Sequence, residues 1–330
     1  MFKFSIDISV LIIFFNRPGC LAQVWEQVKK ARPSKLFLYQ DGAREGNEKD
    51  AIGMAKCREI VSDIDWECEV HRKFQEKNYG CDPSEFIAQK WAFSIVDKCI
   101  ILEDDDVPSQ SFFPFCKELL DRYEYDDRIN MICGMNNVES VDSPYSYLFS
   151  ETGSIWGWAT WRRIVDEWEG DYAFLDNDYE MKQLYDWMKH FNEPPEGRIS
   201  TWKANRASGV EHYETILGVN QLIKHRLNIV PTKNMINNVG NTPEGSTHST
   251  SDLKLIPSGL RRIYTMNRYE IDFPLKHPQY MVEDLSFRRR LNRIMGKGHP
   301  WVRRWRMLEK VWLILKYEGV NALLKKIKRK

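Results

Sequence analysis

The stretch from Ile100 to Asp106 constrains the fold of this chain more than any other part of it. Ile100–Leu102 are apolar, and Glu103–Asp106 are four consecutive carboxylates. A short apolar run is typical of a strand buried on both faces, and parallel sheets bind ligands beyond the carboxyl ends of such strands. Because adjacent carboxylates repel one another, the pattern favours a hard divalent cation, Mg²⁺ or Mn²⁺, at this strand end. A solvated acidic turn is the alternative interpretation.

The residues before Ile100 alternate between apolar runs and helical patterns. We expect strands over Ile8–Phe15, Lys35–Tyr39 and Trp66–Val70, and helices near Leu21–Val28, Lys49–Val61 and Pro83–Val96. This alternation predicts an α/β fold with a mostly parallel central sheet and helices on both faces. The loops after the first two strands then share a sheet edge with the acids. Arg17, Asp41 and the acid cluster are therefore expected to converge.

Composition and charge narrow the class of protein further. With 330 residues, 42% hydrophobic and 29% charged, the chain is expected to be globular, and no apolar run is long enough to span a bilayer. Seven cysteines without a C-x-x-C pair predict reduced thiols, and no signal peptide is indicated, so a cytoplasmic location is expected. Residues 285–330 hold fifteen Lys or Arg against two Glu, a net of +13. Because the whole chain has a net of +1, the preceding residues carry −12.

Several nucleotide and phosphate motifs are missing from the sequence. There is no G-x-G-x-x-G after the first expected strand and no G-x-x-x-x-G-K-[ST] anywhere, which argues against a dinucleotide dehydrogenase and a P-loop NTPase. A haloacid-dehalogenase-type phosphatase would carry Thr or Val where this chain has Pro108. The acid cluster therefore needs another explanation.

The first half of the chain carries several short motifs whose order and separations are informative when they are taken together. They are Phe14–Pro18, Tyr39–Gly42, Asn78–Cys81, Leu102–Asp105, and Pro108 with Phe112–Phe113. Together they resemble the nucleotide-diphospho-sugar glycosyltransferases of the GT-A fold, a Rossmann-like architecture. The likeness is closest to bacterial haemolysin-related, family-2-like enzymes, and more distant to N-acetylglucosaminyltransferase I.

This resemblance implies a donor site for a nucleoside-diphosphate sugar with Mn²⁺ or Mg²⁺. Asp105 would be the direct metal ligand, with Asp104 beside it, and Arg17 would contact the diphosphate. Asp41 would contact a pyrimidine base. The other residues that the resemblance places near the donor are Asn78, Gly80, Glu103, Asp104 and Asp106. An arginine before a helix and an Asp-Gly turn are the structural alternatives for Arg17 and Asp41.

The second half contains an aromatic segment, Ser154–Arg163, with three tryptophans around one glycine. Aromatic side chains mostly pack in cores, and that is one interpretation. The resemblance places Trp156 and Trp158 at the floor of the sugar and acceptor site, where ring faces suit sugar C–H surfaces. Both interpretations can hold for different tryptophans.

Two further sites are implied by the resemblance. Inverting transfer needs a base that deprotonates the acceptor hydroxyl, and Glu211 is the candidate, with Glu214 as the substitute. An acidic first helical turn, which the helix dipole favours, is the alternative explanation of Glu211. The segment Asn237–Gly240, followed by Ser246–Ser249, is similar to a pattern that places His248 on the metal or the diphosphate.

The C-terminal segment predicts a basic amphipathic helix. Its apolar residues recur at spacings of four, three, four and three: Trp301, Trp305, Leu308, Trp312 and Leu315. Such a helix suits the surface of an anionic membrane, reached through residues 301–330. A helix packed on the protein body or on a partner is the alternative. Nucleic-acid binding is disfavoured because the rest of the chain is acidic.

We therefore expect a catalytic domain over residues 1–255 and a basic helical extension over 256–330. The first half of the domain, 1–128, binds the nucleotide sugar, and the second, 129–255, binds the acceptor. The expected function is metal-dependent, inverting transfer of a sugar to a glycan or lipid-linked glycan during bacterial cell-surface polysaccharide or lipopolysaccharide synthesis. A nucleotidyl- or phosphotransferase, or a non-catalytic carbohydrate- or membrane-binding protein, are the alternatives.

Overall fold

The computed structural model describes residues 3–190, 195–241 and 252–322. Its strands are β1 (Ile6–Phe14), β2 (Pro33–Gln40), β3 (Glu69–Phe74), β4 (Lys98–Glu103), β5 (Asp106–Pro108), β6 (Ile129–Cys133), β7 (Tyr147–Ser150), β8 (Trp158–Trp161), β9 (Leu227–Pro231) and β10 (Ile236–Asn238). Its α-helices are α1 (Pro18–Ala31), α2 (Glu48–Ser62), α3 (Cys81–Phe93), α4 (Phe112–Arg122), α5 (Arg162–Asp166), α6 (Asp178–His190), α7 (Pro195–Ser208), α8 (Tyr213–Ile223), α9 (Ser258–Arg261), α10 (Leu285–Met295) and α11 (Pro300–Tyr317). Short 3₁₀ helices are η1 (Ala173–Asp176), η2 (Leu253–Leu255) and η3 (Arg262–Tyr264).

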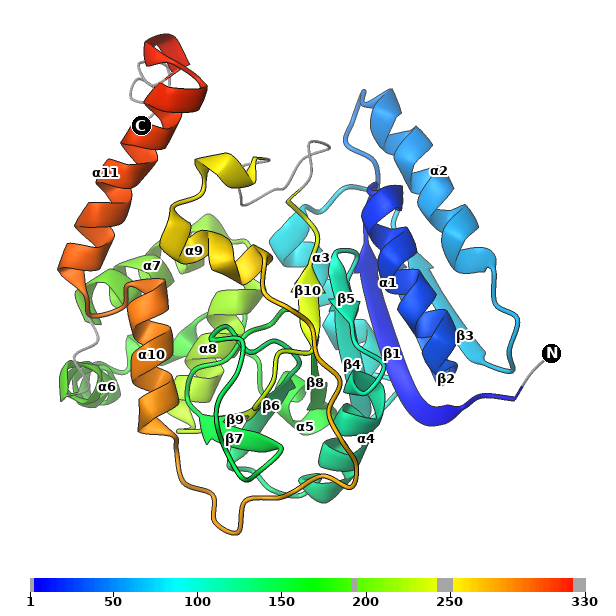
Figure 1. Ribbon diagram of the computed structural model, residues 1–330, viewed down its shortest axis with the longest axis horizontal. Coiled ribbons are helices and arrows are strands. Elements are labelled where there is room, and N and C mark those ends of the chain that lie inside the picture. The colour runs from blue at the N-terminus through cyan, green and yellow to red at the C-terminus, as the bar shows by residue number, and fades with distance from the viewer. Residues whose placement is uncertain (1–2, 191–194, 242–251, 323–330) are drawn as a thin grey trace.

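One eight-stranded sheet organises the molecule, in the order β3-β2-β1-β4-β8-β6-β9-β7 (Figure 1). The strands β1 to β4, β6 and β9 point the same way, whereas β7 and β8 run antiparallel to their neighbours. The strands β5 and β10 form a separate antiparallel pair. The expected α/β fold with a mostly parallel sheet is confirmed.

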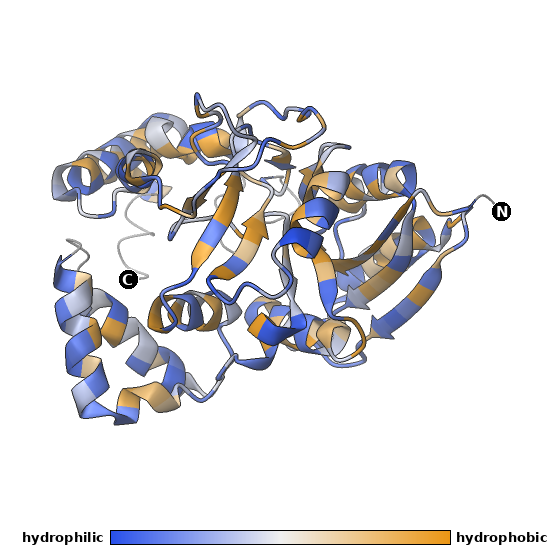
Figure 2. Cartoon of the chain, turned by 90° about the horizontal axis from the view of Figure 1, so that it is seen from below, coloured by the Kyte–Doolittle hydropathy of each residue, from blue (hydrophilic) through white to orange (hydrophobic). Residues whose placement is uncertain are grey.

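Alternate residues of the central strands pack into two different cores. On β1, Val10 and Ile12 face a core that they share with α1, α2 and α4, while Leu11 and Ile13 face a core that they share with α3 and α8. Successive side chains of a strand point to opposite faces, so a strand covered on both sides must be apolar throughout. Figure 2 shows the apolar strands between layers of helices.

Strand register sets the position of the candidate site. Ile13 of β1 pairs with Glu103 of β4, and Phe14 of β1 pairs with Gln40 of β2. The three strands are parallel, so the chain leaves each of them at the same sheet edge. The loops that begin after these pairs carry Arg17 and Asp41 together with the acid cluster.

One expected strand differs in its position from the strand in the structure. The third strand runs over Glu69–Phe74 rather than Trp66–Val70. Trp66 forms only a single β-bridge before it, is fully buried, and donates from Nε1 to the carbonyl of Pro33 at 2.8 Å. The segment Ile229–Ile236 spans the end of β9 and the start of β10. Between them Asn234 is buried, and its Nδ2 donates to two backbone carbonyls, which turns the chain toward β5.

The C-terminal helices lie along one side of the sheet domain. Phe287 and Leu291 of α10 join the core that includes α8, and α11 contacts η2 (Figure 1). In the part of the chain that the structure describes, no helix has the length and apolar character needed to cross a membrane.

Candidate functional site

Arg17 lies where the carboxyl ends of β1 and β4 meet. Its Nη2 donates to Oδ1 of Asp104, its Nε lies 3.4 Å from Oδ2 of Asp104, and its Nη1 lies 2.9 Å from Oδ2 of Asp105. Pro18 begins α1 directly after Arg17, and proline suits the first position of a helix. The pairing of β1 with β4 and the start of α1 therefore fix the guanidinium beside both carboxylates.

Burial controls the electrostatics of the acid cluster. It raises the pKa of Asp104 to about 6, even though Arg17 favours the ionised form. It also raises the pKa values of Glu103 and Asp106 well above their ordinary range, with neighbouring carboxylates adding to the effect. Burial disfavours the charge of Arg17, but Asp104 and Asp105 outweigh it, so the pKa of Arg17 is raised. Burial and mutual repulsion thus oppose ionisation of these acids, and a bound cation would favour their charged forms.

Asp106 is fully buried, and hydrogen bonds occupy both of its carboxylate oxygens. Its Oδ2 accepts from the backbone N–H of Gly157 at 2.8 Å, and its Oδ1 accepts from Nδ2 of Asn238 at 3.2 Å. Nδ2 of Asn238 also donates to Oδ1 of Asp105 at 3.0 Å. Asp106 therefore joins β5 to the tryptophan segment and to β10.

The chain after β10 passes directly over Asp105. An ideal Cβ placed on Gly240 would lie 1.8 Å from Oδ2 of Asp105 and 3.0 Å from Nη1 of Arg17. Only a residue without a side chain allows this approach. A glycine is needed at position 240 because the segments that carry Arg17, Asp105 and Gly240 meet in space. The residues next to Gly240 in the sequence do not predict this contact.

Asp41 holds the loop that precedes α3. Its carboxylate accepts from the backbone N–H groups of Tyr79 at 2.9 Å and Gly80 at 3.0 Å, and from Nδ2 of Asn78 at 2.9 Å. Gly80 has φ of +87°, which suits glycine. The structure thus brings Asp41, Asn78 and Gly80 together as one folded turn.

Glu85 is a member of the cluster that sequence reasoning missed. It lies on α3, is 4% exposed, and accepts from Nε2 of Gln89 at 3.3 Å. Burial raises its pKa well above the ordinary range, and the charges of Asp106, Asp104 and Asp105 act in the same direction. A single glutamate inside a helix gives no sequence signal of this proximity.

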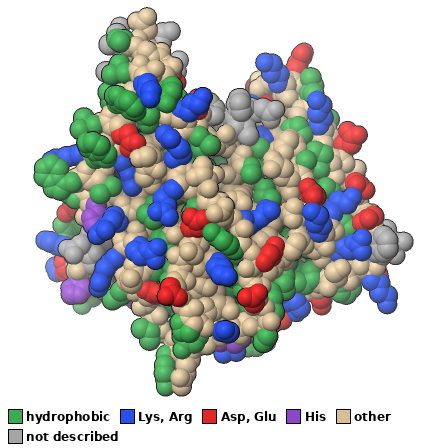
Figure 3. Space-filling view, in the orientation of Figure 1, with side chains coloured by type: hydrophobic (Ala, Val, Ile, Leu, Met, Phe, Trp, Pro, Cys, Tyr) green, Lys and Arg blue, Asp and Glu red, His purple; other side chains and the backbone are tan. Residues whose placement is uncertain are grey.

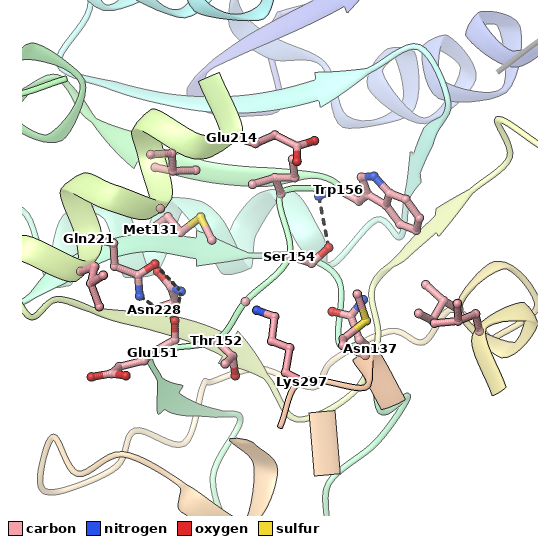
Figure 4. Close-up of a pocket in the computed structure, with 18 of the residues that line it drawn as sticks. Met131, Asn137, Glu151, Thr152, Ser154, Trp156, Glu214, Gln221, Asn228 and Lys297 are labelled. Carbon is pink, nitrogen blue, oxygen red and sulfur yellow. Dashed lines mark hydrogen bonds between the residues drawn. The ribbon is translucent and has the colours of Figure 1, made fainter. Parts of the chain in front are cut away.

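A pocket of about 660 Å³ lies beside the acid cluster. Polar residues from the loop after β7 and from α8 line it, together with apolar residues of η2, α9 and η3. Figure 4 shows Glu214, Ser154 and Trp156 around this pocket, with Lys297 reaching in from the chain after α10. The acids do not line the pocket, but Gly157, which follows Trp156, donates to Asp106. The pocket wall and the acid cluster therefore share one backbone segment.

The tryptophans of this segment divide between core and pocket. Trp158 is 1% exposed and Trp161 is 2% exposed, and both pack in the sheet cores. Trp156 is half-buried, lines the pocket, and has its ring 5.4 Å from that of Tyr264. The structure thus places Trp156 at the pocket and Trp158 in the core.

The two candidate bases lie in different places. Glu214 lines the pocket that also contains Trp156, whereas Glu211 lines a separate pocket with Phe86 and Gly170. Glu214 is also electrostatically close to Cys81, whose thiol pKa is raised mainly by burial and also by Glu103 and Glu214. His248 lies outside the described residues.

The donor chemistry of the cluster fits a divalent cation. Among the described residues, no group of three or more His, Cys, Asp or Glu is arranged to hold a metal. Mg²⁺ and similar hard cations commonly take one or two carboxylates, with substrate phosphates and water completing the coordination. The adjacent carboxylates of Asp104 and Asp105 supply that set.

Comparison with known proteins gives no family assignment. No family model and no curated protein matches the chain. Among solved structures, it is similar to UDP-glucose pyrophosphorylase complexed with UDP-glucose, with 9% identity and a TM-score of 0.34, over 70% of this chain and 92% of that chain. A likeness at this level carries no conclusion about function.

Proposed function

We propose that this chain is a metal-dependent glycosyltransferase of the GT-A fold. It transfers a sugar, with inversion, from a nucleoside-diphosphate donor to a hydroxyl group during bacterial cell-surface polysaccharide or lipopolysaccharide synthesis. The observation that carries the proposal is the contact of Arg17 with Asp104 and Asp105 at the ends of β1 and β4. The sequence motifs described above support it, because they surround these same residues.

In this proposal the donor diphosphate lies beside Arg17 and the acid pair, within reach of the guanidinium and of a cation on the carboxylates. The planar guanidinium matches phosphate oxygens and can donate from both Nη atoms. Asp105 and Asp104 hold Mn²⁺ or Mg²⁺, which when bound stabilises the negative charge of the leaving diphosphate. The pyrimidine base lies against the turn that Asp41 holds through Tyr79 and Gly80.

The pocket beside the cluster holds the acceptor. One wall offers hydrogen-bonding side chains, including Asn137, Ser154 and Asn228, and the other is apolar, including Leu260 and Ile263. A glycan, or a glycan on a lipid, presents both kinds of surface. The ring of Trp156 packs against sugar C–H groups.

Glu214 is the proposed base. Its carboxylate accepts the proton of the acceptor hydroxyl as that oxygen bonds to the anomeric carbon and the diphosphate leaves. We prefer Glu214 to Glu211 because Glu214 lines the same pocket as Trp156.

The test is a turnover assay of the full chain with a panel of nucleoside-diphosphate sugars and Mn²⁺. Release of nucleoside diphosphate, lost in Asp105→Asn, is the expected result. Release of pyrophosphate would instead identify a nucleotidyltransferase that uses the same acids. If no donor is turned over and no donor binds, the protein is non-catalytic.

A further inference from the structure

The helix α11 carries a row of apolar side chains that no described part of the chain covers. The row consists of Trp301, Trp305, Leu308, Trp312 and Leu315, whose exposed fractions lie between 40% and 75%. Their spacing places them on one face of the helix. Figure 3 shows hydrophobic and basic side chains gathered over this part of the surface. An apolar face of this kind usually marks an interaction surface.

This exposed face is not the one that packs on the protein. The buried residues of α11 are Leu313 and Ile314, and the side chain of Glu309 accepts from the backbone N–H of Ser258. At about 100° per residue, Leu313 and Ile314 point away from the row of tryptophans. The helix is therefore anchored on the body through one side, and the tryptophan side faces outward.

Basic side chains border the row on both sides. The guanidinium of Arg304 lies 5.1 Å from the ring centroid of Trp301, and Nζ of Lys316 lies 4.7 Å from that of Trp312. On a helical wheel Arg304 and Lys316 fall about 60° to either side of the row. Each border thus pairs a tryptophan with a cation.

We propose that α11 docks on the surface of an anionic lipid bilayer, with the tryptophan row in the interface and the bordering cations on lipid phosphates. Tryptophan and leucine flanked by Lys and Arg are the composition of helices that lie in this interface. The charge favours this occupant, because residues 285–330 carry a net of +13. A second copy of the chain would bring two such positive helices together and would be repelled.

The docked helix also contributes to the pocket. Lys310 of α11 and Lys297, which follows α10, both line it. Docking therefore places the pocket near the bilayer surface, where a lipid-borne glycan is presented. This consequence rests on the proposed function, whereas the docking itself does not.

Vesicle sedimentation of the full chain, without donor or metal, tests the docking. We expect binding to phosphatidylcholine vesicles that contain phosphatidylglycerol, weaker binding in high salt, and little binding to phosphatidylcholine alone. The triple variant W301A/W305A/W312A is expected to lower the partition coefficient at least about tenfold. The double variant R304Q/K316Q is expected to lower it about fivefold for each cation removed.

Two control variants separate this face from general surface effects. Y125A/Y179A removes exposed aromatic residues elsewhere, and R128Q/K182Q removes exposed cations elsewhere. Both are expected to bind like the wild type, and thermal unfolding checks that all variants are folded. Equal partitioning of the wild type and the tryptophan variant would overturn the proposal. A dimer that the tryptophan variant abolishes, without vesicle binding, would overturn it in favour of self-association.

Discussion

Nη1 of Arg17 lies 2.9 Å from Oδ2 of Asp105, across the carboxyl ends of two adjacent parallel strands. The two side chains are largely buried, with exposed fractions of 18% and 9%. A buried arginine beside two carboxylates offsets part of their negative charge when no other cation is present. It is equally placed to contact the phosphates of a ligand.

Replacing Arg17 tests its part in donor binding. We expect Arg17→Gln to lower kcat/KM by about 10²- to 10³-fold, because a positioned donor to the leaving diphosphate is lost. Arg17→Lys keeps the charge but not the planar fork, so it is expected to recover only part of the activity. Steady-state kinetics over a range of donor concentrations measures both.

Arg288→Gln is the matched control for Arg17. Arg288 is 7% exposed in its side chain and also contacts two carboxylates, Glu151 at 2.8 Å and Glu283 at 3.1 Å. Its replacement is expected to lower the melting temperature, as any broken buried ion pair does, with a much smaller change in kcat/KM. Equal kinetic losses in both variants would mean that Arg17 acts only through stability.

Gly240→Ala tests the close approach over Asp105. A methyl group cannot fit 1.8 Å from a carboxylate oxygen, so the chain near Gly240 must move. We expect a loss of about 1–3 kcal/mol in the free energy of unfolding and weaker binding of donor with Mn²⁺. In Gly197→Ala, where a Cβ meets nothing within 4 Å, the change in stability is expected to be favourable, up to about 1 kcal/mol. If donor affinity is unchanged in Gly240→Ala, the chain near Gly240 does not contribute to the donor site.

Glu214→Gln and Glu211→Gln distinguish the two candidate bases. We expect Glu214→Gln to lower kcat by about 10²- to 10⁴-fold with little change in donor affinity, since only proton transfer is lost. Glu211→Gln is expected to change kcat less than about threefold, as for a substitution away from the reacting groups. A larger loss of kcat in Glu211→Gln than in Glu214→Gln would instead indicate that the acceptor binds in the pocket beside Gly170.

The raised pKa of Asp104 predicts how pH changes stability. Its pKa is about 6 in the folded state and about 4 when unfolded, so between these values the folded state binds more protons. Its contribution is fully present below about pH 4 and is lost as pH rises through about 6. The melting temperature of Asp104→Asn, measured without metal, is therefore expected to rise relative to the wild type between pH 4 and 7. A difference in melting temperature between Asp104→Asn and the wild type that does not vary with pH would contradict the raised pKa of Asp104.

The fold was predictable because its signals are local. The alternation of apolar runs and helical patterns gives the parallel strands, and strand ends of the same direction must share an edge. The convergence of Arg17 with Asp104 follows from that geometry. The third strand begins later than expected because the ladder does not continue from Trp66, which forms a single β-bridge and is held by its side chain on the carbonyl of Pro33.

The rest of the site depends on contacts between distant segments. Asn238 and Gly240 meet Asp105 only because β10 pairs with β5. Each of these strands has three residues, which is too short for a hydrophobic periodicity to predict. Glu211 and Glu214 are three residues apart, and the start of α8 decides which of them lines the pocket. Such choices are made by tertiary packing.

Titration calorimetry of the donor is the most direct test of the proposed metal-dependent donor site. A panel of nucleoside-diphosphate sugars would be titrated into the full chain with and without Mn²⁺, and into Asp105→Asn. We expect binding of at least one donor that requires Mn²⁺ and is lost in Asp105→Asn, because the asparagine side chain keeps the shape of aspartate but not its charge. Donor binding that is equal without Mn²⁺ and in Asp105→Asn, or no binding of any donor, would contradict the proposal.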